Sequence, residues 1–470
     1  MCILLWTLPD NNHPRFKFVF ASNRDEFMRR PASRPAFWDL ATILQRPAVA
    51  AEGDSHTPTV PLDLSSVGIL SSLDTQPALK AEDYDIEIAC SSNPEDQSSN
   101  ASHFHVQAKN IPGTWLGITT HGDLVALTNY REELTYRPPP GFVPLSRGKV
   151  PSEYLASMAA SHAVRVAVPE ATDVYPVTTS AAVTTTTTTT TPLTSERRDL
   201  ADAWIHKLAE RWEKDFEGFN LLVVHEGGSK QYVGSNREGA EVHILAKDNC
   251  IQNGTSTTTT PQEKTISSDS VAGVSNSVFP QPWTKVKRGT RALTNVLNKN
   301  LEVFGSNPSL DSELYDDQTE LAWMVIQLLT MMRIHTSPFV ADCTTPDQIY
   351  AALRERVFIP QVGVIPMWGP GAARQGGLPP ASHDYGTRSS TIVLFGRRSN
   401  IAVYVEKVWY DDWDTELGHR PEYAADSAEG LVWWQGEIGQ PPASWKQIQG
   451  DELEQLLMRA KSIEDPKSVL

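Results

Sequence analysis

The sequence predicts a layered α+β fold, and three observations lead to this prediction. Strand-like runs gather at both ends of the chain, helix-like runs occupy its middle, and three polar stretches interrupt an otherwise regular pattern. Strands from the two ends can then share sheets, with the helices packed outside them. The 470 residues are 40% hydrophobic and 21% charged, which is usual for a globular protein with a sizeable core.

Strands are expected where β-branched and aromatic residues gather between turn-forming residues. Residues 2–7 and 16–21 are two such runs on either side of a turn at residues 9–14, which indicates a β-hairpin. We expect the turn to centre near Asn11 and Asn12, so that antiparallel pairing places Cys2 opposite Ala21 or Ser22. Later runs of the same character cover residues 113–118, 124–128, 220–224, 391–395 and 401–408.

Helices are expected where apolar residues recur at every third or fourth position. Ser195 can cap a helix with an apolar stripe that runs from Leu200 to Trp212. A second stripe runs from Leu321 to Met332. A third helix is expected to open at Pro346, because proline suits the first helical position.

We expect one domain over residues 1–470, interrupted by flexible, disordered insertions at about 47–105, 170–196 and 248–272. These stretches are rich in Ser, Thr, Asp, Asn and Pro, and the second contains unbroken threonine over residues 184–191. Such segments bury too little apolar surface to offset the entropy that they lose on ordering. The remaining residues suffice for one large domain.

The formal net charge of −16 argues against some partners. An acidic protein repels phosphate backbones and anionic lipid, so we expect no nucleic-acid partner and no polybasic membrane anchor. No window approaches the roughly 20 apolar residues of a transmembrane helix, and residues 1–7 lack the basic leader of a signal peptide. The four cysteines show no CxxC pairing, and we expect no metal or other cofactor. We therefore expect a cytoplasmic protein with a small-molecule partner; the sequence identifies no protein partner.

The second residue carries the candidate catalytic group. Because Cys2 is small, the initiator Met1 is expected to be removed, which places a free α-amine and a thiol on one residue. An amine with a pKa of about 7.7–8.0 can take the proton from a thiol near 8.5, and the thiolate can attack an acyl carbon. We therefore expect Cys2 to be a nucleophile.

The polar residues that follow the second strand are expected to meet Cys2. Arg24 can stabilise a thiolate or an oxyanion, and Asp25 can hold the α-ammonium or orient Arg24. Because successive residues of a strand point to opposite sides, Arg24 and Asp25 should face different directions. The alternative is a solvated strand end with an ion pair, and we favour that alternative for Glu26.

Further residues are candidates for the same site. Asn129 ends an apolar run and is either an oxyanion-hole donor, worth about 3 kcal/mol, or the start of an Asx turn. Arg388 either binds a substrate carboxylate or an acyl oxygen, or forms a surface ion pair. We assign Asn23 and Arg388 to substrate binding. Trp115 and Trp283 lie in apolar or turn-flanked blocks and are expected in the core.

Seven short motifs occur in order along the chain. They are MCI at residues 1–3, ASNRDEF at 21–27, GTWLGI at 113–118, LTNYRE at 127–132, GVSN at 273–276, PWTK at 282–285 and YGTRSST at 385–391. These motifs resemble those of the NRDE family, also called the transport and Golgi organisation protein 2 family. The resemblance spans nearly the whole chain and implies a link to Golgi organisation, secretion, and the handling of haem or of lipid metabolites such as acyl-CoA.

That family in turn resembles the cysteine branch of the N-terminal nucleophile (Ntn) hydrolases, which includes choloylglycine hydrolases and penicillin V acylases. The resemblance implies a four-layer αββα sandwich in which Cys2 cleaves an amide bond beside Arg24 and Asp25. In those hydrolases two residues usually separate the Arg from the Asp, whereas Arg24 and Asp25 are adjacent.

The sequence leaves three functions open. The first is a thiol-dependent amidohydrolase or acyl-transfer enzyme that uses Cys2. The second is a non-catalytic protein on the same scaffold that binds and traffics haem or acyl-CoA. The third is an interaction protein that uses its threonine-rich insertions as tethers. Association with the Golgi or with mitochondria would depend on partners or on a signal that the sequence does not reveal.

Overall fold

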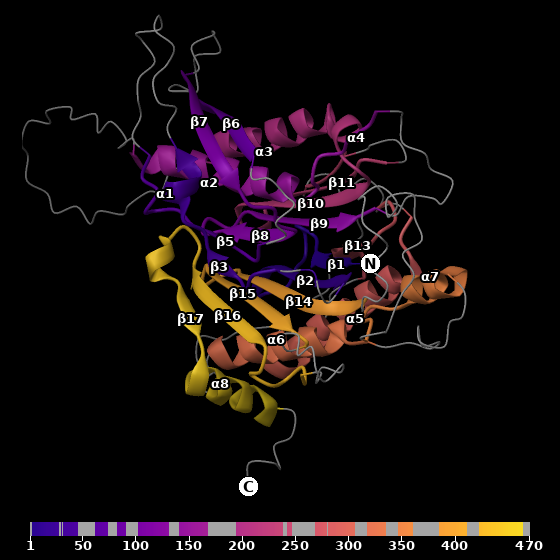
Figure 1. Cartoon of the computed structure of the whole chain (residues 1–470). Helices are drawn as coiled ribbons and strands as arrows, with labels where there is room; N and C mark the ends of the chain where they lie inside the picture. The colour runs from indigo at the N-terminus through magenta and orange to yellow at the C-terminus, as the bar shows by residue number, and fades with distance from the viewer. Residues whose placement is uncertain are drawn as a thin grey trace, which may run out of the picture.

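A computed structural model describes residues 2–27, 30, 32–45, 62–73, 82–90, 102–130, 141–167, 194–237, 242–246, 268–279, 281–305, 317–334, 346–360, 385–410 and 423–463. Within these residues, two large antiparallel sheets lie face to face and helices cover the outside of each sheet (Figure 1). The predicted α+β class and its four-layer αββα arrangement are thereby confirmed.

The first sheet joins strands from both ends of the chain, as the sequence predicts. Its strand order is β13-β1-β2-β14-β15-β16-β17. The strands are β1 (Ile3–Thr7), β2 (Phe16–Phe27), β13 (Val271–Val274), β14 (Tyr385–Gly396), β15 (Ile401–Val408), β16 (Leu431–Glu437) and β17 (Lys446–Ile448).

The second sheet has the order β12-β11-β10-β9-β8-β5-β3. Its strands are β3 (Ala36–Phe37), β5 (Ile69–Ser71), β8 (Leu116–Thr119), β9 (Leu124–Asn129), β10 (Phe219–His225), β11 (Lys230–Ser235) and β12 (Val242–Ala246). A third, small sheet with the order β4-β7-β6 comprises β4 (Leu44–Gln45), β6 (Glu82–Cys90) and β7 (Ser102–Ile111).

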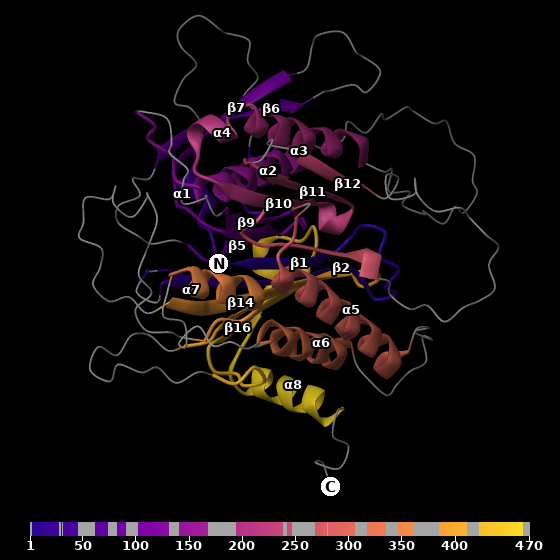
Figure 2. The ribbon, with the colours of Figure 1, turned by 90° about the vertical axis from the view of Figure 1, so that its right-hand side faces the viewer.

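Helices form the two outer layers (Figure 2). Helices α2 (Lys149–Ala167) and α3 (Thr194–Ala209) pack on the second sheet, whereas α5 (Thr284–Phe304), α6 (Asp317–Met332) and α8 (Gly450–Ser462) pack beneath the first. The shorter helices are α1 (Leu40–Ile43), α4 (Trp212–Asp215) and α7 (Pro346–Glu355). The predicted start at Pro346 is confirmed, and the stripe from Leu200 to Trp212 is divided between α3 and α4.

The core follows the alternation of the strands. On β2, Phe18 and Phe20 are fully buried between the two sheets, whereas Val19 and Ala21 are fully buried against the helices beneath the first sheet. The inter-sheet layer is therefore an apolar slab that the two sheets share. After the apolar run of residues 18–21 on β2, polar residues follow from Ser22 onward, where this apolar layer ends.

The register of the first hairpin differs from the prediction. Ile3 pairs with Asn23, so Cys2 lies beside Arg24 and Asp25 rather than opposite Ala21 or Ser22. The difference arises in the loop, where buried Asn11 donates hydrogen bonds from Nδ2 to the carbonyl oxygens of Leu8 and Lys17, each at 2.9 Å. This loop is wider than a turn centred at Asn11 and Asn12.

One predicted insertion contains regular structure. Within the 47–105 stretch, β5 is a fully buried strand of the second sheet, and β6 pairs with β7. Ile69 and Leu70 contribute to the apolar clusters on the two faces of that sheet, which the surrounding polar composition concealed. The 170–196 and 248–272 stretches lie outside the described residues except for 194–196 and 268–272.

Helix α5 packs tightly on β1 at Gly289. A Cβ atom at this position would lie 2.7 Å from Leu5 Cδ1, and Leu5 is fully buried. We expect Gly289→Val to lower the free energy of unfolding by about 1–3 kcal/mol, because the helix must shift or Leu5 must leave its rotamer. Urea denaturation checks this, with Asn295→Val on the exposed face of the same helix as a control. Equal losses in the two variants would contradict close packing at Gly289.

Candidate active site

Cys2 lies immediately before β1 and is partly buried. Its Sγ is 3.9 Å from the carbonyl oxygen of Asp25, within reach of a weak thiol hydrogen bond. Burial raises the pKa of the Cys2 thiol; the charge of the amino terminus acts in the opposite direction, and the negative charges of Asp25 and Glu26 raise the pKa further. The thiol form is therefore favoured at neutral pH unless a base is close.

The main chain of Cys2 is held by two side chains from distant segments. Its carbonyl oxygen accepts a hydrogen bond from Ser275 Oγ at 2.6 Å and another from Lys285 Nζ at 3.3 Å. Ser275 follows β13, and Lys285 lies in the first turn of α5. The position of Cys2 is thus set by the segment after edge strand β13 of the first sheet and by helix α5, which packs on that sheet.

Ser275 also links the two sheets. Its carbonyl oxygen accepts hydrogen bonds from Thr128 Oγ1 at 2.5 Å and from Asn220 Nδ2 at 2.7 Å, and these residues lie on β9 and β10 of the second sheet. The next residue, Asn276, donates from Nδ2 to the carbonyl oxygen of Asn129. One short segment therefore ties Cys2 to the end of β9.

Asp25 and Lys285 form a buried pair beside Cys2. Both side chains are fully buried, and Lys285 Nζ lies 4.0 Å from Asp25 Oδ2. Asp25 Oδ1 accepts a hydrogen bond from Thr387 Oγ1 at 2.6 Å, across the ladder between β2 and β14. Burial lowers the pKa of Lys285, and the negative charges of Asp25 and Cys2 oppose that effect.

Arg24 points to the other side of β2, as the alternation of strand residues predicts. Its Cζ lies 3.5 Å from the centroid of the Trp115 ring, and Trp115 packs on the inter-sheet core. A guanidinium at this distance from an indole face makes a cation–π contact. Trp115 therefore contacts both the core, where we expected it, and a candidate site residue.

A buried carboxylate lies near three arginines. Glu406 on β15 is buried and accepts a hydrogen bond from Ser72 Oγ at 3.0 Å. Burial raises the pKa of Glu406, and the Ser72 hydrogen bond and the positive charges of Arg24, Arg34 and Arg388 act in the opposite direction. We refer to Arg24, Arg34 and Arg388 as the arginine cluster.

The two residues assigned to substrate binding occupy different surroundings. Asn23 is buried and donates from Nδ2 to the carbonyl oxygens of Met332 at 2.9 Å and Val357 at 2.8 Å, so it fixes the end of α6. Arg388 is partly buried at a bulge in the β2–β14 ladder and donates to the carbonyl oxygen of Arg30. Arg388 and Arg24 both act electrostatically on Glu406, so they belong to one cluster. Asn23 instead faces the helices.

Asn129 lies at the end of β9 and is partly buried. Its carbonyl oxygen, rather than its side-chain amide, makes the contact with Asn276 described above. The alternation of β9 places its side chain on the face shared with Val125 and Leu127, which pack on the helix side of the second sheet.

The sequence does not predict individual roles for four residues of this site. Ser275, Asn276, Lys285 and Thr387 all lie within the GVSN, PWTK and YGTRSST motifs, but no role was assigned to them. Their common signal is a polar residue within an otherwise apolar or turn-flanked block. Their meeting point depends on long-range pairing, which local patterns do not reveal.

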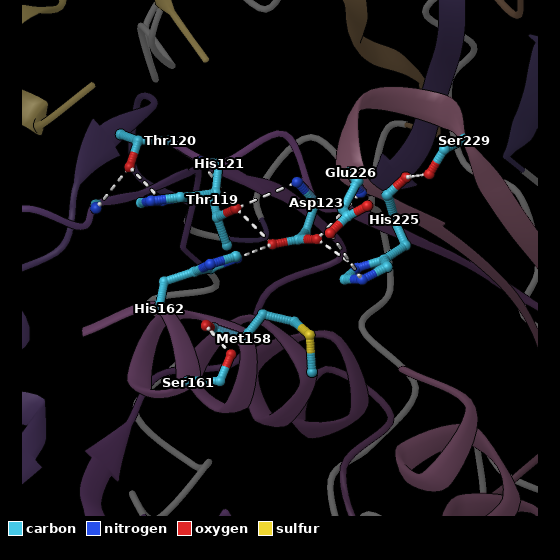
Figure 3. A network of polar contacts seen from close by, with 11 residues as sticks. Thr119, Thr120, His121, Asp123, Met158, Ser161, His162, His225, Glu226 and Ser229 are labelled. Atoms are coloured by element: carbon cyan, nitrogen blue, oxygen red, sulfur yellow. Dashed lines mark hydrogen bonds and ion pairs between the residues drawn. The ribbon is translucent and has the colours of Figure 1, made fainter. Parts of the chain in front are cut away.

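A second buried polar network lies at the opposite end of β9 (Figure 3). The fully buried Asp123 carboxylate contacts His225 Nδ1 at 2.6 Å and His162 Nε2 at 2.9 Å, and it accepts a hydrogen bond from Thr119 Oγ1 at 2.8 Å. The His162 ring stacks on His121 with centroids 4.0 Å apart. Local sequence patterns do not group His162 with His225, because His162 lies on α2 and His225 at the end of β10.

This network joins three elements of the fold. Its carboxylate connects the β8–β9 turn with α2 and β10, and both histidines are buried. Among the residues that the structure describes, no group of three or more His, Cys, Asp or Glu side chains is arranged to hold a metal ion. Burial acts to raise the pKa of Asp123, but the charge and hydrogen bonds of His225 and His162 hold it well below 3.8.

We expect Asp123→Asn to lower the free energy of unfolding by about 3 kcal/mol, because hydrogen bonds to a buried charge are lost. The folded-state pKa is depressed, so the stabilisation is complete above the ordinary value of 3.8 and is lost as the pH falls below it. Denaturation at several pH values checks this, with exposed Asp451→Asn as a control. The network would not be stabilising if Asp123→Asn behaved like the control.

Comparisons with known proteins identify the family. The family model described as "Transport and Golgi organisation 2" matches residues 1–50 and 101–411. No curated protein matches the chain. The 51–100 gap contains β5, so this chain builds part of its second sheet from residues that the family model does not match.

Solved structures that resemble the chain include a mutant and a variant of the conjugated bile acid hydrolase from Clostridium perfringens. Each is 8% identical over 83% of this chain and 95% of that chain, with a TM-score of 0.21. The fold assignment therefore rests on the layers described above. In the described part of the chain, no helix is both long and apolar enough to span a bilayer. The family model matches most of the chain, and the protein belongs to the transport and Golgi organisation 2 family.

Proposed function

We propose that Cys2, once Met1 has been removed, is the nucleophile of an amidohydrolase or acyl-transfer reaction. The observation that carries this proposal is the fixed position of Cys2, whose carbonyl oxygen is held by Ser275 and Lys285 while Asp25 lies beside it. A nucleophile held in one position avoids part of the entropic cost of reaching its transition state.

The reaction follows from groups on one residue. The α-amine of Cys2 takes the thiol proton, and the thiolate attacks the carbonyl carbon of an amide to form a C–S bond and an oxyanion. Collapse of this intermediate breaks the C–N bond, and the α-ammonium returns the proton to the leaving amine. Water, or another acceptor, then cleaves the thioester and restores the thiol.

Neighbouring residues have distinct roles in this proposal. Asp25 stabilises the α-ammonium, and Arg24 provides a cation on the inter-sheet side of β2. Asn276 ties the end of β9 to the segment that holds Cys2, but the Asn129 side chain faces the helix side of the second sheet, so an oxyanion-donor role for Asn129 requires that side chain to turn toward Cys2. The raised pKa of Cys2 makes the amine necessary, since the thiol does not ionise readily by itself.

A second candidate function is the binding and trafficking of an anionic metabolite without catalysis. The observation that favours it is the arginine cluster, whose three positive charges all act on buried Glu406. Haem propionates and the phosphates of acyl-CoA are anions that guanidinium groups bind well. In this function a cytosolic protein carries its ligand to the Golgi or to mitochondria, and links to secretion arise from that transport.

Catalysis is tested by turnover of fluorogenic N-acyl amides that differ in acyl length. We expect Cys2→Ala to abolish cleavage, because no other group replaces the nucleophile, and to leave the free energy of unfolding nearly unchanged. Acid quenching should trap a thioester on Cys2 of the unmodified protein. The control is Cys90→Ala, which removes a thiol from β6. Cleavage that survives in Cys2→Ala would rule out this mechanism.

The binding function is tested by titrating the protein with haemin and, separately, with oleoyl-CoA. We expect saturable binding that persists in Cys2→Ala and weakens by at least about tenfold in Arg388→Met, because a charge-assisted contact contributes roughly 1.5–3 kcal/mol. Isothermal titration calorimetry measures both affinities. Arg459→Met on exposed α8 is the control for a general loss of positive charge. Equal affinity in Arg388→Met and in the control would speak against the arginine cluster as the binding site.

A further inference from the structure

Lys285 differs from ordinary surface lysines in its position. Its side chain is fully buried, and Nζ reaches both the carbonyl oxygen of Cys2 and the carboxylate of Asp25. We infer that Lys285 is a positioning residue for Cys2, which holds the main chain of residue 2 and, as an ammonium, favours the thiolate form of its side chain. This inference rests on the proposed function and adds a residue to that site.

The helix that carries Lys285 has little freedom to move it away. Val286 follows it in the sequence and packs in the core between α5 and the first sheet. One turn later, the Gly289 contact with Leu5 keeps the same helix against β1. Because Cys2 immediately precedes β1, the helix and the strand fix the ammonium and residue 2 relative to one another.

The charges around Cys2 explain why a cation is needed there. Burial raises the pKa of the thiol, and the negative charges of Asp25 and Glu26 on β2 raise it further. The charge of the amino terminus lowers the pKa of Cys2, Lys285 is a positive group on the helix side of this site, and Arg24 lies on the inter-sheet side of the strand. A positive charge close to a thiol favours its ionised form. Lys285 therefore offsets the negative charge of Asp25 at the point where a thiolate must form.

A purely structural role makes a different prediction. If Lys285 only neutralised Asp25 and closed a hydrogen bond, its loss would lower stability without changing the ionisation of Cys2. If it favours the thiolate, its loss must displace the pH profile of Cys2 reactivity to higher pH. The ionisation of Cys2 is the readout that separates the two roles.

The experiment compares full-length protein with its Lys285→Met and Lys285→Arg variants. Alkylation of Cys2 by iodoacetamide is followed from pH 6 to 10 by peptide mass analysis. We expect the profile of Lys285→Met to move to higher pH, with a rate at about pH 7.5 that is roughly tenfold lower, and Lys285→Arg to recover part of the loss. Lys407→Met is the matched control, because Lys407 is also buried but contacts Ser427 and Glu429.

An unchanged alkylation profile in folded Lys285→Met would overturn the inference. If that variant does not fold, the reciprocal effect is measured by NMR of ¹³C-labelled lysine in the unmodified protein and in Cys2→Ser. Loss of the thiolate must then lower the titration midpoint of Lys285, and an unchanged midpoint would also overturn the inference. Amide turnover by the unmodified protein is measured in parallel. If the alkylation profile of Lys285→Met is displaced but the unmodified protein cleaves no amide, the proposed function is contradicted and the inference about Lys285 stands.

Discussion

A buried ion pair between Lys285 and Asp25 holds the amino end of the first hairpin in place. The pair joins α5 to β2, and Lys285 also binds the carbonyl oxygen of Cys2. Removing one member of a buried pair leaves the other charge without compensation, which costs several kcal/mol, so both residues must be present together. The rest of the candidate site depends on this contact, because it decides where residue 2 lies relative to the polar end of β2.

The adjacency of Arg24 and Asp25 divides the site between two layers. Asp25 faces the helices with Lys285 and Thr387, whereas Arg24 faces the second sheet and lies on Trp115. In an enzyme, this arrangement would place Asp25, which stabilises the α-ammonium, on one face of β2 and Arg24, which binds the ligand, on the other. In a carrier the same arrangement leaves the arginine cluster to bind an anion. The two candidate functions therefore use opposite faces of one strand.

The sequence predicts the layers better than the contacts. Period-two runs place the strands of the inner sheets, and the Leu321–Met332 stripe places α6, because burial on one face leaves a local periodic pattern. The predicted pairing of Cys2 with Ala21 or Ser22 was wrong, because the strand register depends on the loop that buried Asn11 widens. The roles of Lys285 and the meeting of His162 with His225 at Asp123 depend on contacts between distant segments, which leave no local pattern.

The central claim is that residue 2 presents an amine and a thiol together at the polar end of the first hairpin. The most direct test is the intact mass of the protein purified from its own cells, combined with sequencing of its first residues. The account predicts a mature chain that begins at Cys2 with an unmodified amine. A chain that retains Met1, or whose Cys2 amine is acetylated, would contradict the claim, because the base that the thiol requires would be absent.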